Sequence, residues 1–574
     1  MLARLNKIKN WQAVTIILLV GFITFFRGLK NQFIGDDFPQ IVNNLPVHSI
    51  SNLRQFFEGG TFYAAGVGLN GMYYRPLMTT TFSVLYTLFG PHPFYFHLTQ
   101  LLLDIGSSVI LYLFLRYSFK PLLSLLLALI FLVHPINSEI VYAIPCMQDA
   151  LYFFFGMLAL WILARSQSIK SLILVTVSLF LSLLAKETAI LFVILSVLYL
   201  FWWNRRRLYS FIIMISLPIV VWFFLRINAI GLNPAPDNAP IDSLDLAHRL
   251  LNVPAIMEFY LSKVVFPWRL ASEYYWVYSK ISIEHFFVPL CVDIAVMTVM
   301  ILVGIKISRC STKVLHYTYL FFAAWFIFGM LLIVQIIPLD MTVSEAWFYF
   351  PIVGILGMLG VVLTAFYSVN INRKEFIYWL MIILIIIFGV RSALRATDWR
   401  GALALDYTNI KTSNDDYVGE ENIAAALYNQ GKLVEAKPYA EASIKIYTTG
   451  DNYYVLGLID SEQGNYIQAE KVFHAGLQHK DSLEADQLLS ENDARMMVLV
   501  SKPASAKQFI ENGLDSYPQD ADLWLYLALV DYKSGDVADA KYAISKAVNY
   551  SDNQNSTIAA ASSIIMNNGS LKLK

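Results

Sequence analysis

The chain has 574 residues, and its 42 Lys+Arg and 42 Asp+Glu give a formal net charge of zero. Hydrophobic residues form 57% of it and the mean hydropathy is +0.54, which excludes a wholly soluble or disordered chain. Residues 1–400 hold 28 basic and 18 acidic residues, whereas residues 401–574 hold 14 and 24. No basic tract is present, so nucleic acid is not an expected partner. The three cysteines lie far apart and lack metal-ligand spacing.

Eleven stretches are apolar and long enough to cross a bilayer, for which a helix needs about 20 residues. They lie at about 11–27, 94–115, 121–136, 140–162, 171–185, 188–204, 208–226, 286–306, 316–337, 348–368 and 376–394. Two further stretches, 76–90 and 252–267, are also apolar and would raise the number to thirteen. We expect these two to lie along the membrane surface, for a reason that the charges supply.

The positive-inside rule decides between eleven and thirteen spans. With eleven, the predicted cytoplasmic segments hold fifteen basic residues and a single acid, Glu375. With 76–90 as a full span, Arg116 and Lys120 would move to the outer side. The eleven-span arrangement places the N-terminus in the cytoplasm, makes the first span a retained signal anchor, and leaves everything after the last span outside. Chemistry is therefore expected on the outer face.

After the last span the sequence repeats with a period of about 34 residues, which is typical of tetratricopeptide helix–turn–helix units. The units lie near 417–449, 450–486, 487–520 and 521–552. The second carries Tyr453, Leu456, Gly457, Gly464, Ala469 and Phe473, and the fourth carries Trp524, Leu527, Ala528, Gly535, Ala540 and Ile544 at matching positions. The sequence thus predicts an all-α chain with a multi-pass membrane domain, 1–397, followed by an α-solenoid, 398–574.

Four stacked repeats form a concave surface of the kind on which solenoids bind peptides. Tyr428, Tyr454 and Tyr526 are candidates to line this surface and to bind an acceptor. The alternative is that all three are core residues, because helical repeats bury the aromatic side chains of their apolar faces.

The segment GDDFPQIVNN, directly after the first span, places two adjacent carboxylates, Asp36 and Asp37, at the predicted outer surface. A carboxylate beside a low-dielectric region tends to have a raised pKa and can act as a general base. Adjacent loop residues need not point the same way, so one carboxylate can act on substrate while the other orients or caps. The alternative is an Asx turn or a helix cap.

Other charged residues from separate segments fall on the same predicted face. They are Arg75 in YYRP, His134 and Glu139 in HPINSE, Asp149 where the next span begins, Lys186 and Glu187 in LLAKETAIL, and Glu345 in SEAWFYFP. Snorkelling explains a lone Lys or Arg at a span end, but a cluster from several loops indicates a site. In the second span, His97, Gln100 and Asp104 share one helical face, which indicates either a cavity or hydrogen bonds between helices.

Taken in order, these segments resemble the transmembrane and tetratricopeptide repeat-containing family of protein O-mannosyltransferases and its prokaryotic relatives. The resemblance runs through GDDFPQIVNN, YYRPLMTTTFSVLYTLFG, FHLTQLLLDIGSSVILYLFLR, HPINSEIVYAIPCMQDALYFFFGMLAL, LLAKETAILF and EAWFYFP to the repeats. It implies a GT-C glycosyltransferase fold. It also implies an inverting transfer of a sugar, mannose or another hexose, from a polyprenyl-phosphate carrier to Ser or Thr of an extracytoplasmic protein that the repeats bind.

The resemblance further implies roles for individual residues. Asp36 becomes the catalytic base with Asp37 in support, and Arg75 and Lys186 become candidates to stabilise the departing phosphate. The residues expected at the cavity are His97, Asp104, His134, Glu139, Asp149, Glu187 and Glu345.

The chain departs from the family in two places, and both departures remove positive charge. Ala346 follows Glu345 where relatives tend to have arginine, and the stretch Pro145–Gln148 precedes Asp149 where relatives have Gly, Arg and then Lys or Ala. The short repeat array favours a bacterial or archaeal cytoplasmic membrane over the endoplasmic reticulum. The expected partners are a lipid-linked sugar donor and a protein acceptor, and the sequence indicates no metal or other cofactor, although a divalent metal is compatible with it.

Two other functions fit the same features. A transferase could act on a lipid or a glycan, with the repeats recruiting partners. A non-enzymatic membrane scaffold could use the repeats to bind peptides. A transporter is disfavoured because the sequence lacks paired, interrupted helices in inverted repeats.

Overall fold

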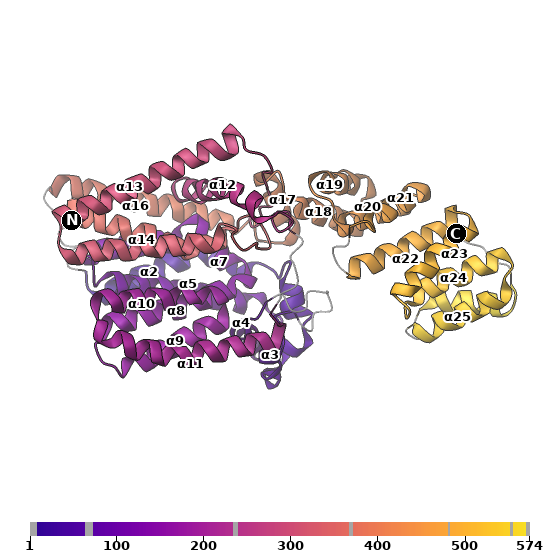
Figure 1. Cartoon of the computed structure of the whole chain (residues 1–574), viewed down its shortest axis with the longest axis horizontal. Coiled ribbons are helices and arrows are strands. Elements are labelled where there is room, and N and C mark those ends of the chain that lie inside the picture. Colours follow the sequence, from indigo (N-terminus) through magenta and orange to yellow (C-terminus); the bar gives the residue numbers. More distant parts are fainter. Residues whose placement is uncertain are drawn as a thin grey trace. The chain divides into compact units, whose positions relative to one another are not determined.

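The computed structural model describes residues 8–62, 73–232, 239–366, 371–479, 483–551 and 555–569. Its contacts divide the chain into two compact units, Met1–Asn414 and Asp415–Lys574, and Figure 1 shows both as bundles of helices. The described residues contain no strand, only an isolated antiparallel bridge between Tyr274 and Val343.

The described residues of the first unit form fifteen helices and a further helix, α17, which follows the last apolar helix. The helices are α2 (Asn10–Phe25), α3 (Gln55–Glu58), α4 (Pro76–Phe89), α5 (Pro93–Leu115), α6 (Pro121–Val133), α7 (Glu139–Tyr142), α8 (Met147–Arg165), α9 (Ser171–Ala185), α10 (Ile190–Trp203), α11 (Arg205–Ile230), α12 (Leu246–Val265), α13 (Val288–Cys310), α14 (Lys313–Ile333), α15 (Pro351–Phe366), α16 (Ile371–Arg395) and α17 (Ala402–Thr412). Short 3₁₀ or π segments connect them: η1 (Phe26–Lys30), η2 (Phe38–Val42), η3 (Leu45–His48), η4 (Ile50–Asn52), η5 (Pro135–Asn137), η6 (Ile144–Cys146), η7 (Glu187–Ala189), η8 (Ile283–Phe287) and η9 (Glu345–Tyr349).

Eight helical stretches of the described residues are long and apolar enough to cross a membrane. They are Asn10–Lys30, Pro93–Leu115, Ile144–Arg165, Arg205–Ile230, Ile283–Cys310, Lys313–Ile333, Glu345–Phe366 and Glu375–Arg395. A ninth would be Pro121–Val133 joined to Pro135–Tyr142 through a bend of 52°. These helices make the chain a multi-pass membrane protein.

The remaining predicted spans correspond to two shorter apolar helices, Ser171–Ala185 and Glu187–Trp203. Every predicted span therefore coincides with an apolar helical stretch, although residues 367 and 368 of the tenth lie outside the described residues. Of the described residues, only eight stretches reach the length of a full span, so the total of eleven stays a prediction. α4 and α12, predicted to lie along the membrane, are not among the eight.

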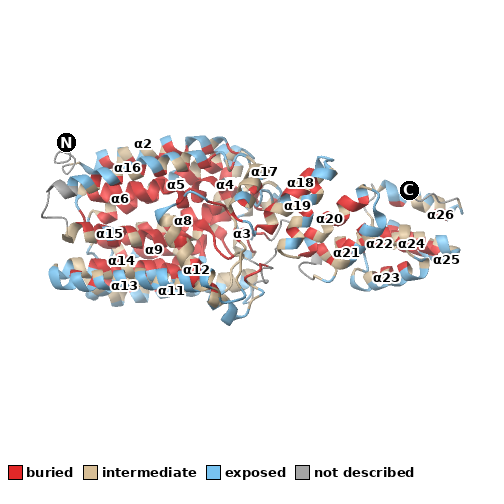
Figure 2. Cartoon of the chain, turned by 90° about the horizontal axis from the view of Figure 1, so that it is seen from above, coloured by how far each residue is buried: buried red, intermediate tan, exposed pale blue. Residues whose placement is uncertain are grey.

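Burial separates the central helices of this unit from those at its surface. The apolar windows of Ile144–Arg165 and Glu345–Phe366 are each 72% buried, whereas those of Arg205–Ile230 and Ile283–Cys310 are each 11% buried. Figure 2 shows the same division, with buried residues through α5, α6 and α8 and exposed ones along α11 and α13. An exposed apolar helix is stable in lipid but not in water, so the exposed surfaces of α11 and α13 are suited to contact with the bilayer.

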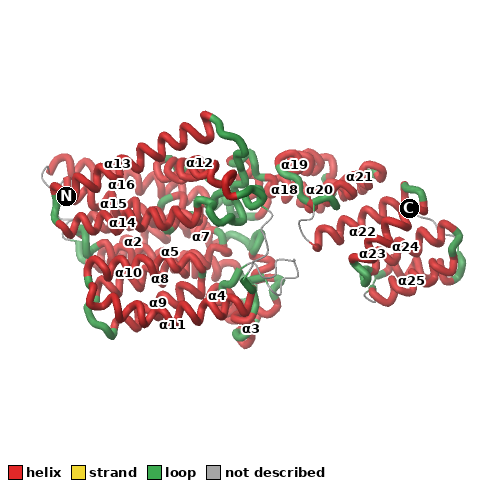
Figure 3. Tube along the Cα trace, in the orientation of Figure 1, coloured by secondary structure: helices red, strands yellow, loops and turns green. Residues whose placement is uncertain are grey.

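The longer connections of the first unit gather at one of its ends. Figure 3 shows these loops near α3, α4 and α12, while short connections close the opposite end. This is the end that carries the charged residues described below, so the loops and the polar side chains share one boundary of the bundle.

The second unit is a series of helix pairs. Its helices are α18 (Tyr417–Asn429), α19 (Leu433–Ile446), α20 (Gly450–Glu462), α21 (Tyr466–Gly476), α22 (Leu483–Val500), α23 (Pro503–Ser516), α24 (Ala521–Ser534), α25 (Val537–Tyr550) and α26 (Ser556–Met566). Consecutive helices pack against one another throughout. The helices pair as α18 with α19, α20 with α21, α22 with α23 and α24 with α25. α22 begins at Leu483, inside the range predicted for the second repeat, so the boundaries of the four repeats stay predictions; residues 480–482 and 552 lie outside the described part.

The turns of three pairs need glycine. Gly431, Gly464 and Gly535 lie between paired helices with φ of +73°, +79° and +90°, a region that residues with a Cβ rarely adopt. A repeated ion pair links neighbouring units: Lys437 Nζ lies 2.6 Å from Asp460 Oδ1, and Lys507 Nζ lies 2.7 Å from Asp531 Oδ1. The same contact thus joins the first unit to the second and the third to the fourth.

Gly457 should not tolerate alanine. A Cβ at this position would lie 2.3 Å from Cε1 of the fully buried Phe473 ring, and overpacking of this kind costs about 1–3 kcal/mol. We expect Gly457→Ala to accelerate hydrogen exchange of the α20 and α21 amides in the full chain. Gly513→Ala is the matched control, because its Cβ would meet the two terminal methyl groups of Leu523, at 3.2 and 3.8 Å. Equal protection in the two variants would contradict this packing.

Candidate functional site

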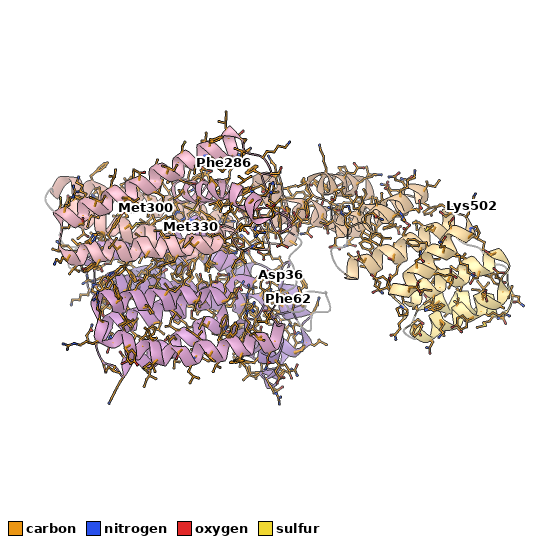
Figure 4. All side chains as sticks on the ribbon, viewed as in Figure 1. Asp36, Phe62, Phe286, Met300, Met330 and Lys502 are labelled. Atoms are coloured by element: carbon orange, nitrogen blue, oxygen red, sulfur yellow. The ribbon has the colours of Figure 1, made fainter. Side chains whose placement is uncertain are left out.

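Asp36 and Asp37 lie in a tight turn directly after the first apolar helix. Gly35, with φ of +50°, opens the turn, and Figure 4 shows Asp36 at the end of the bundle where Phe62 also lies. The Asp37 carboxylate accepts the backbone N–H of Ile34 at 2.8 Å and is 1% exposed. Burial raises the pKa of Asp37 to about 8. Asp37 therefore stabilises the turn, as in the Asx-turn alternative, and its supporting role in catalysis stays a prediction.

Asp36, in contrast to Asp37, is an exposed residue. Its nearest polar contact is the amide of Gln40, whose Nε2 lies 3.4 Å from Oδ2. The surrounding protein displaces part of its hydration and so raises its pKa; the negative charge of Asp340 raises it further, while Arg75 acts in the opposite direction. An accessible carboxylate with a raised pKa has the properties of a general base.

Arg75 connects Asp36 to other charged residues. It is the N-cap residue of α4, is 8% exposed, and places its guanidinium 4.0 Å from the centre of the Tyr73 ring. The Tyr73 hydroxyl donates to Asp340 Oδ2 at 3.0 Å, and Arg75 Nη2 lies 3.9 Å from Glu187 Oε1. We refer to Asp36, Tyr73, Arg75, Glu187 and Asp340 as the Asp36 cluster.

Lys186, the second predicted phosphate ligand, is paired within the protein. It lies between α9 and η7, is 9% exposed, and its Nζ contacts Asp149 Oδ1 at 2.8 Å. Asp149 comes from the first turn of α8. A phosphate would have to share this ammonium group with Asp149, whereas the ion pair that Arg75 makes among the described residues is the longer one to Glu187, at 3.9 Å. The phosphate-binding roles of both cations stay predictions.

A second cluster is fully buried. Arg395 Nη1 lies 2.5 Å from Glu345 Oε2 and 3.2 Å from Ser138 Oγ, and Tyr274 donates its hydroxyl to Glu345 Oε1 at 2.9 Å. Glu139 accepts the backbone N–H of Ala346 at 3.0 Å. We refer to Ser138, Glu139, Tyr274, Glu345 and Arg395 as the Arg395 cluster. Its contacts join the end of α16 to η9 and to the bend between η5 and α7.

The two clusters are neighbours. Cys146 lies within electrostatic range of Glu139, of Asp149 and Lys186, and of Arg75. The structure therefore brings most of the predicted cavity residues to one region, with the Asp36 cluster open to solvent and the Arg395 cluster closed. Among the described residues, no group of three His, Cys, Asp or Glu side chains lies close enough to hold a metal ion.

The polar face of α5 is used for contacts between helices. Gln100 Nε2 donates to the carbonyls of Ile140 and Ala143 at 2.5 Å each, and Asp104 Oδ1 accepts the Tyr349 hydroxyl at 2.6 Å. His97 is 2% exposed. Of the two interpretations of this stripe, hydrogen bonding between helices is the one that describes Gln100 and Asp104.

His134 is also a structural contact. It is 1% exposed, its Nε2 lies 3.1 Å from the carbonyl of Val264, and its Nδ1 accepts the backbone N–H of Ile136. The ring thus joins α12 to the bend after α6, because both of its nitrogen atoms are occupied by backbone groups.

The three tyrosines of the repeats lie near charged residues of α22. Tyr428, Tyr454 and Tyr526 come from the first helix of their units and are half-buried. Arg495 lies within electrostatic range of Tyr428 and Tyr526, and Glu491 lies within range of Tyr454 and Tyr526. They are therefore neither fully buried nor isolated, and a peptide-binding role stays a prediction.

Comparison with known proteins points to one group of enzymes. The human protein O-mannosyl-transferase TMTC1 is 33% identical over 143 residues, which cover 24% of this chain and 16% of that protein. Human TMTC4 is 32% identical over 164 residues, 26% of this chain and 22% of that protein. The Caenorhabditis elegans protein O-mannosyl-transferase F38B6.6 is 24% identical over 269 residues, 45% of this chain and 38% of that protein. The chain is a relative of these protein O-mannosyl-transferases.

The resemblance expected from the sequence is thus confirmed, and the matched part of the chain spans 16–38% of the length of these three relatives. No family model matches the chain. Among solved structures, the tetratricopeptide repeat domain of P58(IPK) matches 72% of this chain and 97% of that domain, with 11% identity and a TM-score of 0.18. A TM-score this low carries no argument about the fold.

Sequence reasoning missed Arg395, Tyr274 and Asp340. Arg395 supplies a guanidinium to Glu345. The sequence did contain a sign that Arg395 has a specific role. Arg391 and Arg395 lie at the predicted outer end of the last span, where the positive-inside rule disfavours basic residues. No local pattern marks Tyr274 or Asp340, since both lie in irregular loops.

Proposed function

We propose that this chain is an inverting glycosyltransferase of the GT-C type. It transfers a hexose from a polyprenyl-phosphate carrier to Ser or Thr of an extracytoplasmic protein. The observation that carries the proposal is Asp36: an accessible carboxylate with a raised pKa, beside the buried cation Arg75, at the loop-bearing end of an apolar helix bundle. The relatives named protein O-mannosyl-transferase support the choice of a sugar and a protein as substrates.

The proposed reaction is one displacement. The acceptor hydroxyl oxygen attacks the anomeric carbon on the face opposite the phosphate, and the Asp36 carboxylate takes the hydroxyl proton. The anomeric C–O bond to phosphate breaks, and its electron pair leaves with the polyprenyl phosphate. Arg75, with Lys186 nearby, stabilises the charge that develops on this phosphate. Asp37 keeps the turn in place, and an apolar bundle suits a donor with a lipid tail.

The decisive experiment is mass spectrometry of extracytoplasmic proteins from cells that carry or lack this chain. We expect hexose-bearing Ser/Thr peptides to disappear without it. Unchanged peptides together with the loss of a hexose from a lipid or a glycan would instead establish the alternative acceptor class. If peptides, lipids and glycans were all unchanged, the chain would instead be a non-enzymatic scaffold. In that case its function should be retained when a single membrane anchor replaces the apolar helices.

The orientation of the chain belongs to the same proposal, with the N-terminus in the cytoplasm, the repeats outside, and a bacterial or archaeal cytoplasmic membrane as its location. A phosphatase fused at residue 400 should be active, because that enzyme matures only outside the cytoplasm. An inactive phosphatase there, with an active cytoplasmic reporter at the same position, would reverse the orientation.

The repeats are proposed to bind the acceptor through Tyr428, Tyr454 and Tyr526. Replacing all three by phenylalanine keeps the rings but removes the hydroxyl groups, whereas replacing them by alanine removes the contact surface. We expect the alanine variant to raise KM for a protein acceptor at least about tenfold at unchanged kcat, which corresponds to about 1.4 kcal/mol of lost binding. Transfer to a short soluble acceptor serves as the control, and an unchanged KM would contradict the role.

Asp340 should tune the pH dependence of transfer. A base must be ionised to act, so activity rises with pH through the pKa of Asp36. The charge of Asp340 raises that pKa, so Asp340→Asn should lower it and move the acid limb of the pH–rate profile to lower pH. The control is Glu284→Gln, which removes an acid whose side chain is 86% exposed. A shift towards higher pH would contradict the assignment of Asp36 as the base.

A further inference from the structure

An apolar cavity of about 480 Å³ lies on the membrane-facing side of the first unit. Helices α12, α13, α14 and α15 contribute its lining, which includes Leu261, Val296, Met300, Phe326 and Met358. Figure 4 labels Met300 on α13, one of the helices whose apolar surface is mostly exposed. The cavity therefore opens towards lipid, and neither the Asp36 cluster nor the Arg395 cluster contributes to its lining.

The length of the cavity matches one leaflet of a bilayer. Along α13 its lining runs from Val292 to Val303, and at 1.5 Å per residue this distance is about 16 Å. The hydrocarbon core of a bilayer is about 30 Å thick, so the cavity covers about half of it. An acyl chain of a lipid in one leaflet is long enough to fill the cavity from the end at which α13 begins.

Two carboxylates lie at that end. Glu258 on α12 is part of the cavity wall, and Asp293 on α13 follows the lining residue Val292 and lies within electrostatic range of Glu258. The Oδ1 atom of Asp293 is buried and has no hydrogen-bond partner among the described residues. Carboxylates at a membrane boundary are costly unless a cation or a donor meets them, and the proposed transfer uses neither of these two.

We propose that this cavity binds one phospholipid with a primary ammonium headgroup, with an acyl chain along α13 and the ammonium at Glu258 and Asp293. Charge complementarity selects this occupant. An ammonium has three N–H donors for the two carboxylates. A lipid that carries only a phosphate would leave both carboxylates uncompensated.

The test is native mass spectrometry of the purified full chain in detergent. It is titrated separately with dioleoyl phosphatidylethanolamine, phosphatidylcholine and phosphatidylglycerol. We expect the ethanolamine lipid to bind about tenfold more tightly than the choline lipid, which has no N–H donor. Glu258→Gln with Asp293→Asn should remove this preference, while Glu284→Gln keeps it. The single variant Val296→Trp fills the cavity and should weaken the binding of all three lipids. Melting curves measured without added lipid verify that each variant is folded.

Three results would overturn the proposal. The three lipids could bind equally to the unsubstituted chain, or the double variant could retain the preference for ethanolamine. Undecaprenyl phosphate could compete with phosphatidylethanolamine and bind more tightly to the double variant, in which case the cavity holds the tail of the donor. Because binding is measured without any transfer, these outcomes are independent of whether Asp36 is the catalytic base.

Discussion

Replacing Asp36 by asparagine should lower the transfer rate by about 10²–10⁴-fold, the usual contribution of a general base. The substitution keeps the size and polarity of the side chain. Asp36 is exposed, and among the described residues its carboxylate bonds only to Gln40, at 3.4 Å. We therefore expect the amount of protein in the membrane and its melting temperature in detergent to stay unchanged. Transfer is measured with a polyprenyl-phosphate hexose and a Ser/Thr-containing protein acceptor.

Substitution of Asp37 should have a different effect, because Asp37 is buried whereas Asp36 is exposed. Asp37→Ala removes the acceptor of the Ile34 N–H, and a buried donor left unpaired costs about 1–3 kcal/mol. This variant should lose stability as well as activity, whereas Asp36→Asn should lose activity alone. Transfer by Asp36→Asn within about tenfold of the unsubstituted rate would refute Asp36 as the base. A loss of stability in that variant would mean that Asp36 holds the turn instead.

Replacing Arg395 by methionine should lower the free energy of unfolding by about 3–5 kcal/mol, because it leaves a carboxylate buried without its cation. Arg395 is 1% exposed and Glu345 is fully buried. The Tyr274 hydroxyl would still donate to Glu345, but one neutral donor does not replace the Arg395 guanidinium, which also donates to Ser138 Oγ. Unfolding in detergent with increasing amounts of sodium dodecyl sulfate measures the loss.

The double variant Arg395→Met with Glu345→Gln separates the ion pair from the volume of the side chains. Because removing both charges relieves the uncompensated burial, it should recover most of the stability lost by Arg395→Met alone. Arg400→Met, at an exposed position five residues further along, is the matched control and should have little effect. If the double variant were as unstable as the single one, packing rather than charge would account for the role of Arg395.

Local patterns predicted most of the fold. Runs of apolar residues gave the positions of the helices, because a helix in lipid must be apolar along its length and pairs its backbone groups internally. Likewise, Gly431, Gly464 and Gly535 recur at the turns of the predicted repeats, and all three adopt the positive φ that the turn requires. The Asp36 turn was also predictable, since it depends on Gly35 and Ile34 next to it.

Pairings between distant segments were not predictable in the same way. Lys186 is the clearest case: the sequence favours it as a phosphate ligand, yet it lies 2.8 Å from Asp149 of another helix. Asp104 is another, since its partner Tyr349 comes from η9. Such contacts depend on how the helices pack, and the apolar surfaces that pack them are too alike in composition to specify a partner from sequence.

The sequence alone determined that the chain is helical, that much of it belongs in a membrane, that repeats follow, and that two carboxylates emerge after the first apolar helix. These properties depend on residues close together in the chain, where helix geometry and the hydrophobic effect act directly. Only the tertiary structure decided that Asp36 is accessible while Asp37 is bound, that Asp340 and Arg75 flank Asp36, and that Arg395 meets Glu345. Charge–charge interactions depend on distance in space, and that distance is set only when the helices have packed.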